Sequence, residues 1–252
     1  MAIPIKTPEQ VAGIRRAARI VAEVLDRVPS WLRPGMTTAE LNEKIDTLIR
    51  QRGGIPAFLG YRGFPAASCI SLNHEVVHGI PSLLKRIREG DLVKVDVGVI
   101  WQGYYGDAAR TYAVGEVSPL ARELMRVTER ALYRGIEQAR PGRRLYDISA
   151  AIQDEVERHG FHVVRELTGH GVGLKLHEEP MIPNFREPST RRIFLKPGMV
   201  LALEPMVNIG TPRVYTLEDH WTVVTADGSL SAHFEHTVLI TKDQPEILTR
   251  LD

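Results

Sequence analysis

The 252-residue sequence is poor in cysteine, with Cys69 as the only one. A single cysteine excludes a disulfide within the chain, and such low cysteine use is typical of a reducing compartment. Long apolar runs are also lacking: no stretch approaches the ~18 residues of a membrane-spanning helix, and the first ten residues contain no apolar signal segment. We therefore expect a cytoplasmic protein.

An excess of charge of either sign is absent too. Lysine and arginine together number 32 against 31 aspartates and glutamates, which gives a net charge of +1. This balance does not call for a nucleic-acid or membrane partner. Hydrophobic residues make up 43% of the chain, enough for a large core, so residues 1–252 are expected to form a single α/β domain.

The segment HEVVH at residues 74–78 matches the pattern of zinc proteases, in which two histidines bind zinc and the glutamate acts as a base. That site requires a helix, because only a helix turns residues four apart to one side. The flanks predict a strand instead: SCISLN precedes the motif, two valines lie inside it, and Gly79-Ile80-Pro81 ends it. We therefore predict that HEVVH is not a helical zinc site, although His78 can still serve another role.

Signals for helices occur twice along the chain in the same order. A capping box at TPEQ (7–10) and another at Thr37 with Glu40 predict two helices, and Ser118 followed by proline predicts a third. Residues 33–53 align with residues 140–160 at an offset of 107, and residues 90–96 align with residues 198–204 at an offset of 108. This repeat predicts two related halves, about 7–115 and 116–252, with a site between them.

Two aspartates flank a predicted hairpin in the first half. The segment VDVGVIWQGYYGDAARTYAV has two β-rich runs around Gln102-Gly103, with Asp96 in one run and Asp107 in the other. Paired strands can bring such side chains to one face of a sheet. An aspartate in an apolar strand must be hydrogen-bonded, charge-paired or metal-bound, and the pair together favours a metal.

The second half adds further candidate ligands. Glu204 ends an apolar run that aligns with the run ending in Asp96, Glu235 is expected in a strand of another hairpin after Asp227-Gly228, and His170 lies among glycines. By itself a histidine such as His170 is more often a hydrogen-bonding loop residue than a ligand, and the same interpretation is given to His159, His162, His220, His233 and His236. Two aspartates, two glutamates and one histidine suit two divalent ions; manganese, iron, cobalt and zinc are all compatible.

The chain resembles a known family in eight ordered segments: LGYRGFPAASCISLN, VVHGIP, KVDVGV, YYGDAART, TGHGVG, LHEEP, ALEPM and FEHTVLIT. Together they are similar to type I methionine aminopeptidases of the bacterial form. The resemblance implies the pita-bread fold, an α/β (α+β) architecture of two pseudo-symmetric halves with antiparallel sheet covered by helices. It also implies removal of the initiator methionine before a small second residue, by attack of a water activated by two metal ions.

The resemblance assigns roles to individual residues. It implies five metal ligands: Asp96, Asp107, His170, Glu204 and Glu235. His78 and His177 are expected to contact the substrate, His177 by stabilising the oxyanion, and Glu204 is also expected to move protons. The methionine side chain is expected to lie against Phe58, Tyr61, Phe64, Cys69, Leu176 and Trp221, residues whose alternative role is ordinary core packing.

Two other functions are compatible with this fold. One is a proline-specific aminopeptidase with the same metal ligands; such enzymes usually carry an added N-terminal domain, whereas here the first predicted helix begins near Thr7. The other is a catalytically silent pita-bread protein that serves as a binding module and would be expected to have lost ligands. The expected substrates are the N-termini of nascent polypeptides at the ribosome, and the expected form is a monomer.

Overall fold

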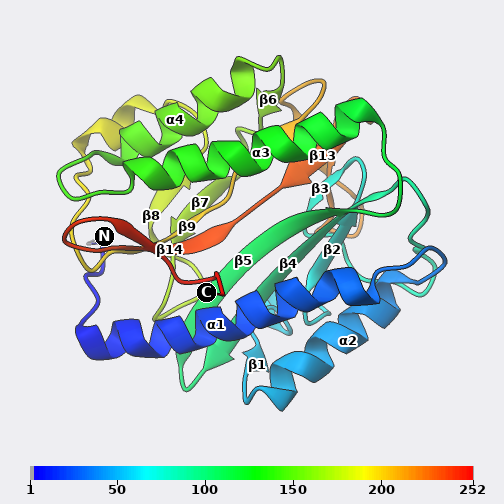
Figure 1. Cartoon of the computed structure of the whole chain (residues 1–252), viewed down its shortest axis with the longest axis horizontal. Coiled ribbons are helices and arrows are strands. Elements are labelled where there is room, and N and C mark those ends of the chain that lie inside the picture. Colours follow the sequence, from blue (N-terminus) through cyan, green and yellow to red (C-terminus); the bar gives the residue numbers. More distant parts are fainter. Residues whose placement is uncertain (1–2, 252) are drawn as a thin grey trace.

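The computed structural model describes residues 3–251, and its four long helices lie in two pairs (Figure 1). The first pair is α1 (Pro8–Trp31) and α2 (Thr38–Gln51), and the second is α3 (Pro119–Gln138) and α4 (Leu145–Glu157). Figure 1 shows the pairs on opposite sides of the molecule with the strands between them. None of the helices in residues 3–251 is both long and apolar enough to cross a membrane.

The predicted caps begin three of these helices. The Gln10 amide donates to Thr7 Oγ1 (3.3 Å), and the Glu40 amide donates to Thr37 Oγ1 (3.2 Å). Both caps are reciprocal, because the Gln10 and Glu40 side chains accept from the cap backbone. Ser118 caps α3 by accepting from the Ala121 amide (3.1 Å), without a reciprocal bond because alanine has no side-chain acceptor. The three predicted helix starts are therefore confirmed.

The strands are short except for one hairpin, and every pairing among residues 3–251 is antiparallel. The first half contains β1 (Ile55–Pro56), β2 (Cys69–Leu72), β3 (Glu75–Val77), β4 (Leu92–Trp101) and β5 (Tyr104–Ala113). The second contains β6 (His162–Val163), β7 (Thr168–Gly171), β8 (Glu178–Pro183), β9 (Val200–Leu203), β10 (Met206–Asn208), β11 (Val214–Thr216), β12 (Val223–Thr225), β13 (Ser231–His233), β14 (His236–Ile240) and β15 (Pro245–Ile247). They form sheets in the orders β1-β4-β2 with β5 on β4, β15-β14-β9-β7-β8, β13-β10-β6 and β11-β12-β3. Two short 3-10 turns, Tyr61–Gly63 and Pro188–Arg192, complete the elements.

The internal repeat of the sequence is also a repeat of structure. An isolated β-bridge joins Thr37 to Arg86 in the first half, and another joins Arg144 to Phe194 in the second. Thr37 corresponds to Arg144 at the offset of 107, and Arg86 corresponds to Phe194 at the offset of 108. The glycine of each RPG segment precedes its bridge with a left-handed φ, +88° at Gly35 and +80° at the corresponding glycine of the second copy.

Each helix pair covers a separate hydrophobic core. Beneath α1 and α2 the fully buried side chains include Ile20, Val24, Leu41, Ile45, Ile70 and Val95. Beneath α3 and α4 they include Leu124, Val127, Leu132, Ile148, Ile152 and Leu201. A third buried cluster joins the halves, with Ile14 of α1 in the same cluster as Val200 and Leu239, so the site must lie beside an apolar contact between the halves.

One predicted element is wrong. Glu235 was expected in a strand of a hairpin formed after Asp227-Gly228, but it lies in the break between β13 and β14. The strands on either side of that turn do not pair with each other, since β12 pairs with β11 and β3 while β13 pairs with β10. Strand propensity on both sides of a turn does not determine which partner each strand takes.

Candidate metal centre

The β4–β5 hairpin places Asp96 and Asp107 on one face, as the sequence predicts. Asp96 pairs with Ala109, and Asp107 pairs with Gly98. Gly98 is two residues beyond Asp96 and therefore points to the same side of the sheet. The two aspartates are diagonal neighbours, so their carboxylates approach each other across the ladder.

The second half contributes three further side chains at one end of a ladder. Glu204 directly follows β9 and Glu235 directly precedes β14, and the strand residues beside them, Leu203 and His236, pair with each other. On the other side of β9, His170 pairs with Ala202. The His170 Nε2 atom lies 3.4 Å from Glu204 Oε1 and 3.8 Å from Asp107 Oδ2. Five residues from distant segments thus converge.

Hydrogen bonds between β5 and the region of β14 hold the two halves in register at this point. The Thr237 hydroxyl donates to the Asp107 carbonyl (2.7 Å), and the Asp107 amide donates to Thr237 Oγ1 (3.1 Å). The Glu235 amide donates to the Ala109 carbonyl (2.8 Å). These bonds attach the backbones of Asp107 and Glu235 to the other half, which limits how far these two carboxylates can move apart.

The electrostatics of this cluster fit a bound cation. Burial raises the pKa of Asp96 to about 7, and burial with neighbouring carboxylates raises the pKa of Asp107 and Glu235 well above their usual range. The pKa of Glu204 is raised by the same two causes. Within residues 3–251, Asp96 Oδ1, Asp107 Oδ1 and Glu235 Oε1 are buried without a hydrogen-bond partner. Buried carboxylate oxygens of this kind are stabilised by metal ions.

The ligand atoms are also close enough to share ions. One atom from each of Asp107, His170 and Glu235 lies within 4.8 Å of the others, and the same holds for Glu204, His233 and Glu235. Carboxylate oxygens with imidazole nitrogens and no thiolate suit first-row divalent metals. The residues present therefore fit divalent metal ions.

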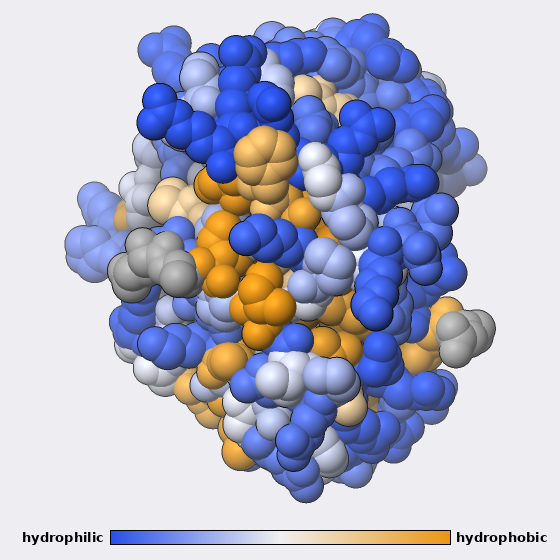
Figure 2. Space-filling model, turned by 90° about the vertical axis from the view of Figure 1, so that its left-hand side faces the viewer, coloured by the Kyte–Doolittle hydropathy of each residue, from blue (hydrophilic) through white to orange (hydrophobic). Residues whose placement is uncertain are grey.

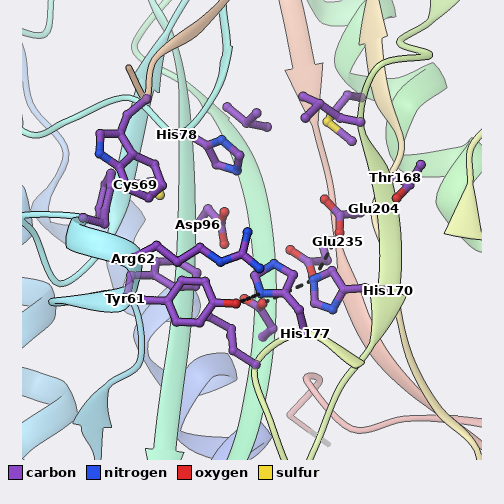
Figure 3. A pocket seen from close by; sticks show the side chains of 18 of the residues that line it. Tyr61, Arg62, Cys69, His78, Asp96, Thr168, His170, His177, Glu204 and Glu235 are labelled. Carbon is purple, nitrogen blue, oxygen red and sulfur yellow. Dashed lines mark hydrogen bonds and ion pairs between the residues drawn. The ribbon is translucent and has the colours of Figure 1, made fainter. Parts of the chain in front are cut away.

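A pocket of about 270 Å³ opens beside the carboxylates (Figure 3). The six residues predicted for the methionine side chain all line it: Phe58, Tyr61, Phe64, Cys69, Leu176 and Trp221. Phe64 and Trp221 pack edge to face with ring centroids 5.1 Å apart. The buried Cys69 pairs with Asp96 across β2 and β4, so the apolar wall continues directly into the carboxylate cluster.

His78 and His177 also line this pocket, and both are held as neutral rings. Burial, with the nearby His177, lowers the pKa of His78 to about 4. Burial and then the Arg62 guanidinium lower the pKa of His177. The Nδ1 atom of His177 is 2.9 Å from the Tyr61 hydroxyl, and the two rings stack at 5.3 Å. This bond engages one ring nitrogen and leaves Nε2 for another partner (Figure 3).

The HEVVH segment is a strand, as predicted, and not a zinc-binding helix. Residues Glu75–Val77 form β3. His74 is exposed and does not line the pocket, whereas His78 does. The Glu75 carboxylate accepts a hydrogen bond from the Leu72 amide (2.7 Å) and pairs with Lys85 (2.7 Å). Its partners stabilise the turn between β2 and β3, so the glutamate has a structural role.

Several residues of the site were not anticipated. Arg62, Val77, Glu166, Leu167, Thr168 and Met206 also line the pocket. Arg62 and Val77 adjoin predicted site residues in sequence, and Thr168 and Met206 lie two positions from one, which was the available signal. His233 was interpreted as a loop hydrogen-bonder, yet it ends β13 with its Nε2 buried and without a partner in residues 3–251.

A shallower hollow continues from the pocket toward the surface. It shares Arg62, Thr168, His170 and His177 with the pocket. Its other lining residues are apolar or charged: Pro4, Leu174, Lys175, Glu178, Glu179 and Met181. Figure 2 views the molecule from the left of Figure 1, the side of β8 and the N-terminal segment, and shows apolar side chains gathered across the middle of that face. The site therefore has an apolar end and an open end.

Comparisons with known proteins agree with this geometry. A model of metallopeptidase family M24 matches residues 12–242. Methionine aminopeptidase of Clostridium acetobutylicum is 49% identical over 98% of both chains, and methionine aminopeptidase 1 of Bacillus subtilis is 48% identical over 98% of both. The crystal structure of methionine aminopeptidase from Thermotoga maritima superposes with a TM-score of 0.97, at 48% identity over 99% of this chain and 100% of that chain. Prolidase from Pyrococcus furiosus superposes with a TM-score of 0.80 at 28% identity, and this chain covers 66% of it.

Proposed function

The chain belongs to metallopeptidase family M24 and, within it, to the methionine aminopeptidases with the pita-bread fold, and we propose that it removes the initiator methionine from nascent polypeptides. The observation that carries this proposal is the position of the aromatic pocket, whose wall at Cys69 adjoins the carboxylate cluster at Asp96. A methionine side chain in the pocket would place its own peptide carbonyl at the carboxylates. The high identity to methionine aminopeptidases over nearly the whole chain supports the same substrate.

We propose two divalent ions, cobalt, manganese, iron or zinc, held by Asp96, Asp107, His170, Glu204 and Glu235. Such ions, when bound, polarise a carbonyl and lower the pKa of a water. The two aspartates lie on one face of the β4–β5 hairpin, and the two glutamates lie together at one end of the β9–β14 ladder. Two such pairs of carboxylates support a site for more than one ion. Glu204 lies at the pocket wall and would also accept and release a proton.

The histidines would act on the peptide itself. With Nδ1 of His177 engaged by the Tyr61 hydroxyl, a proton on Nε2 can be donated to the scissile carbonyl oxygen as negative charge develops there. His78, on the opposite side of the pocket in Figure 3, would contact the peptide near the scissile bond. The remainder of the substrate would leave along the open hollow past Arg62 and His177. A small second residue is expected because this passage is bordered by His177 next to His170, whose ring centroids are 4.2 Å apart.

The proposal is tested with Met-Ala-Ser and Met-Leu-Ser as substrates for chelator-stripped protein, before and after titration of Mn²⁺, Co²⁺, Fe²⁺ or Zn²⁺. Metal-dependent release of methionine from Met-Ala-Ser, with little from Met-Leu-Ser, is the expected result. Glu235→Ala should lose the activity, whereas the exposed His74→Ala serves as the matched control and should keep it. No release with any metal would overturn the proposal.

A further inference from the structure

His233 occupies a fixed place next to the proposed metal ligands Glu204 and Glu235. It is 1% exposed and ends β13, where it pairs with Met206 of β10. Its backbone is held on both sides by one side chain of the other half: the Thr111 hydroxyl donates to the His233 carbonyl (2.7 Å), and the His233 amide donates to Thr111 Oγ1 (2.9 Å). The imidazole therefore projects from an anchored backbone.

The ring of His233 faces Glu204. Its Nε2 atom is buried without a hydrogen-bond partner in residues 3–251 and lies 3.8 Å from Glu204 Oε2. The other carboxylate oxygen, Oε1, is 3.4 Å from His170 Nε2. Glu204 thus lies between two imidazoles. Of the three residues, His170 and Glu204 line the pocket, whereas His233 is not among its described lining residues.

We propose that His233 is a positioning residue that donates a hydrogen bond from Nε2 to Glu204 and orients that carboxylate for metal binding. This inference rests on the proposed function. A small rotation of the Glu204 carboxylate, of about 1 Å at Oε2, brings the pair to hydrogen-bond distance. Carboxylates that bind metals are commonly hydrogen-bonded from behind, and loss of such a partner costs about 10–100-fold in metal affinity or activity.

A competing role is direct ligation. One atom each of Glu204, His233 and Glu235 lies within 4.8 Å of the others, so an ion could in principle contact the His233 nitrogen. The positioning role is favoured because His233 is 1% exposed and is not among the residues that line the pocket, whereas Glu204 is. The two roles differ in one chemical property: a positioning His233 keeps its proton on Nε2, whereas a ligand must lose it.

The first test is calorimetric titration of chelator-stripped protein with Mn²⁺, comparing wild type with His233→Gln and His233→Leu. Gln retains a donor and should bind Mn²⁺ within about threefold of wild type, whereas Leu should bind about 10–100-fold more weakly. The exposed His162→Leu is the control variant, and melting temperatures verify folding. Equal losses in Gln and Leu would overturn positioning in favour of direct ligation, and wild-type affinity in the Leu variant would overturn any role toward the metal.

A double mutant tests whether His233 acts through Glu204. In a Glu204→Gln background, adding His233→Leu should cause no further loss of Mn²⁺ affinity, because the group being oriented has already been altered. An additional tenfold loss would contradict the inference.

If the Leu variant does not fold, wild-type protein labelled with ¹⁵N-histidine is loaded with Zn²⁺ instead. An Nε2 proton retained on His233 supports positioning, and its loss overturns it. Failure of the wild type to bind metal or to release methionine would count against the proposed function itself, so the two failures are distinguishable.

Discussion

Gly98 and Phe58 are in direct contact: a methyl group added to Gly98 would lie 2.6 Å from Phe58 Cε1. Gly98 is also the residue that pairs with Asp107 in the β4–β5 hairpin. Phe58 of the aromatic pocket and the backbone of the carboxylate cluster therefore meet at a position where any side chain would press on the Phe58 ring.

We expect Gly98→Ala to displace the Phe58 ring and narrow the pocket. Overpacking of this kind costs about 1–3 kcal/mol of folding stability. The displaced ring should also weaken binding of the methionine side chain by about 1.4 kcal/mol, so KM for Met-Ala-Ser should rise about tenfold while Mn²⁺ affinity stays within a few-fold of wild type. Steady-state kinetics and calorimetry measure the two quantities. Adding Phe58→Leu should restore much of the lost activity, and an unchanged KM in Gly98→Ala would contradict the expectation.

Asp96 makes the metal-free protein sensitive to pH. Burial raises its pKa to about 7, so the folded state holds this proton more tightly than the unfolded state does. The resulting stability is fully present below the unfolded pKa of about 4 and is lost as the pH rises through about 7. Without metal, Asp96→Asn should therefore melt at a higher temperature than wild type at about pH 8, with a much smaller difference at about pH 5.

Comparison with Asp96→Asn in calorimetric scans removes the contribution of the buried histidines, which titrate in both proteins. A melting-temperature difference that is the same at both pH values would show that Asp96 does not titrate between them. In the presence of saturating Mn²⁺ the order should reverse, because the variant lacks a proposed ligand.

Tyr61→Phe should impair His177 without removing the aromatic wall. The variant loses the 2.9 Å hydrogen bond to His177 Nδ1 but keeps a ring that can stack on the imidazole. A typical hydrogen bond contributes about 0.5–1.5 kcal/mol, so kcat should fall about 2–10-fold. Tyr61→Leu, which removes the stacking as well, should lose more; equal kcat values for Tyr61→Phe and wild type would show that the hydroxyl does not orient His177.

The two histidines of HEVVH should behave differently. His74→Ala is expected to keep full kcat/KM because the side chain is exposed and does not line the pocket. His78 lines the pocket, and His78→Ala should lower kcat/KM about 10–100-fold through loss of the proposed contact to the peptide. Peptide hydrolysis assays at saturating metal measure both. A large loss in His74→Ala would revive the zinc-protease interpretation of this segment.

Local features were predictable wherever a short stretch of chain decides the structure. The caps at Thr7, Thr37 and Ser118 depend on hydrogen bonds within three residues, and their helices begin as expected. The hairpin of Asp96 and Asp107 depends on a tight turn and on the two-residue period of strands. Glu235 was misplaced because the partners of β12 and β13 are chosen by distant segments.

The pocket illustrates the same limit. Phe58, Tyr61, Phe64 and Trp221 are as suitable for a core as for a binding site in composition, and only their arrangement around a hollow beside Asp96 distinguishes the two. The resemblance to a known family also makes that distinction, whereas periodicity and spacing do not.

By itself the sequence determined the elements that local hydrogen bonding and side-chain period control: the capped helices, the aspartate hairpin, the repeated halves and the strand character of HEVVH. Only the tertiary structure decided that His170, Glu204 and Glu235 meet the aspartates, and that His233 faces Glu204. The physical reason is that these approaches depend on bonds between segments about 130 residues apart, such as Thr237 to Asp107, whose register no local pattern specifies.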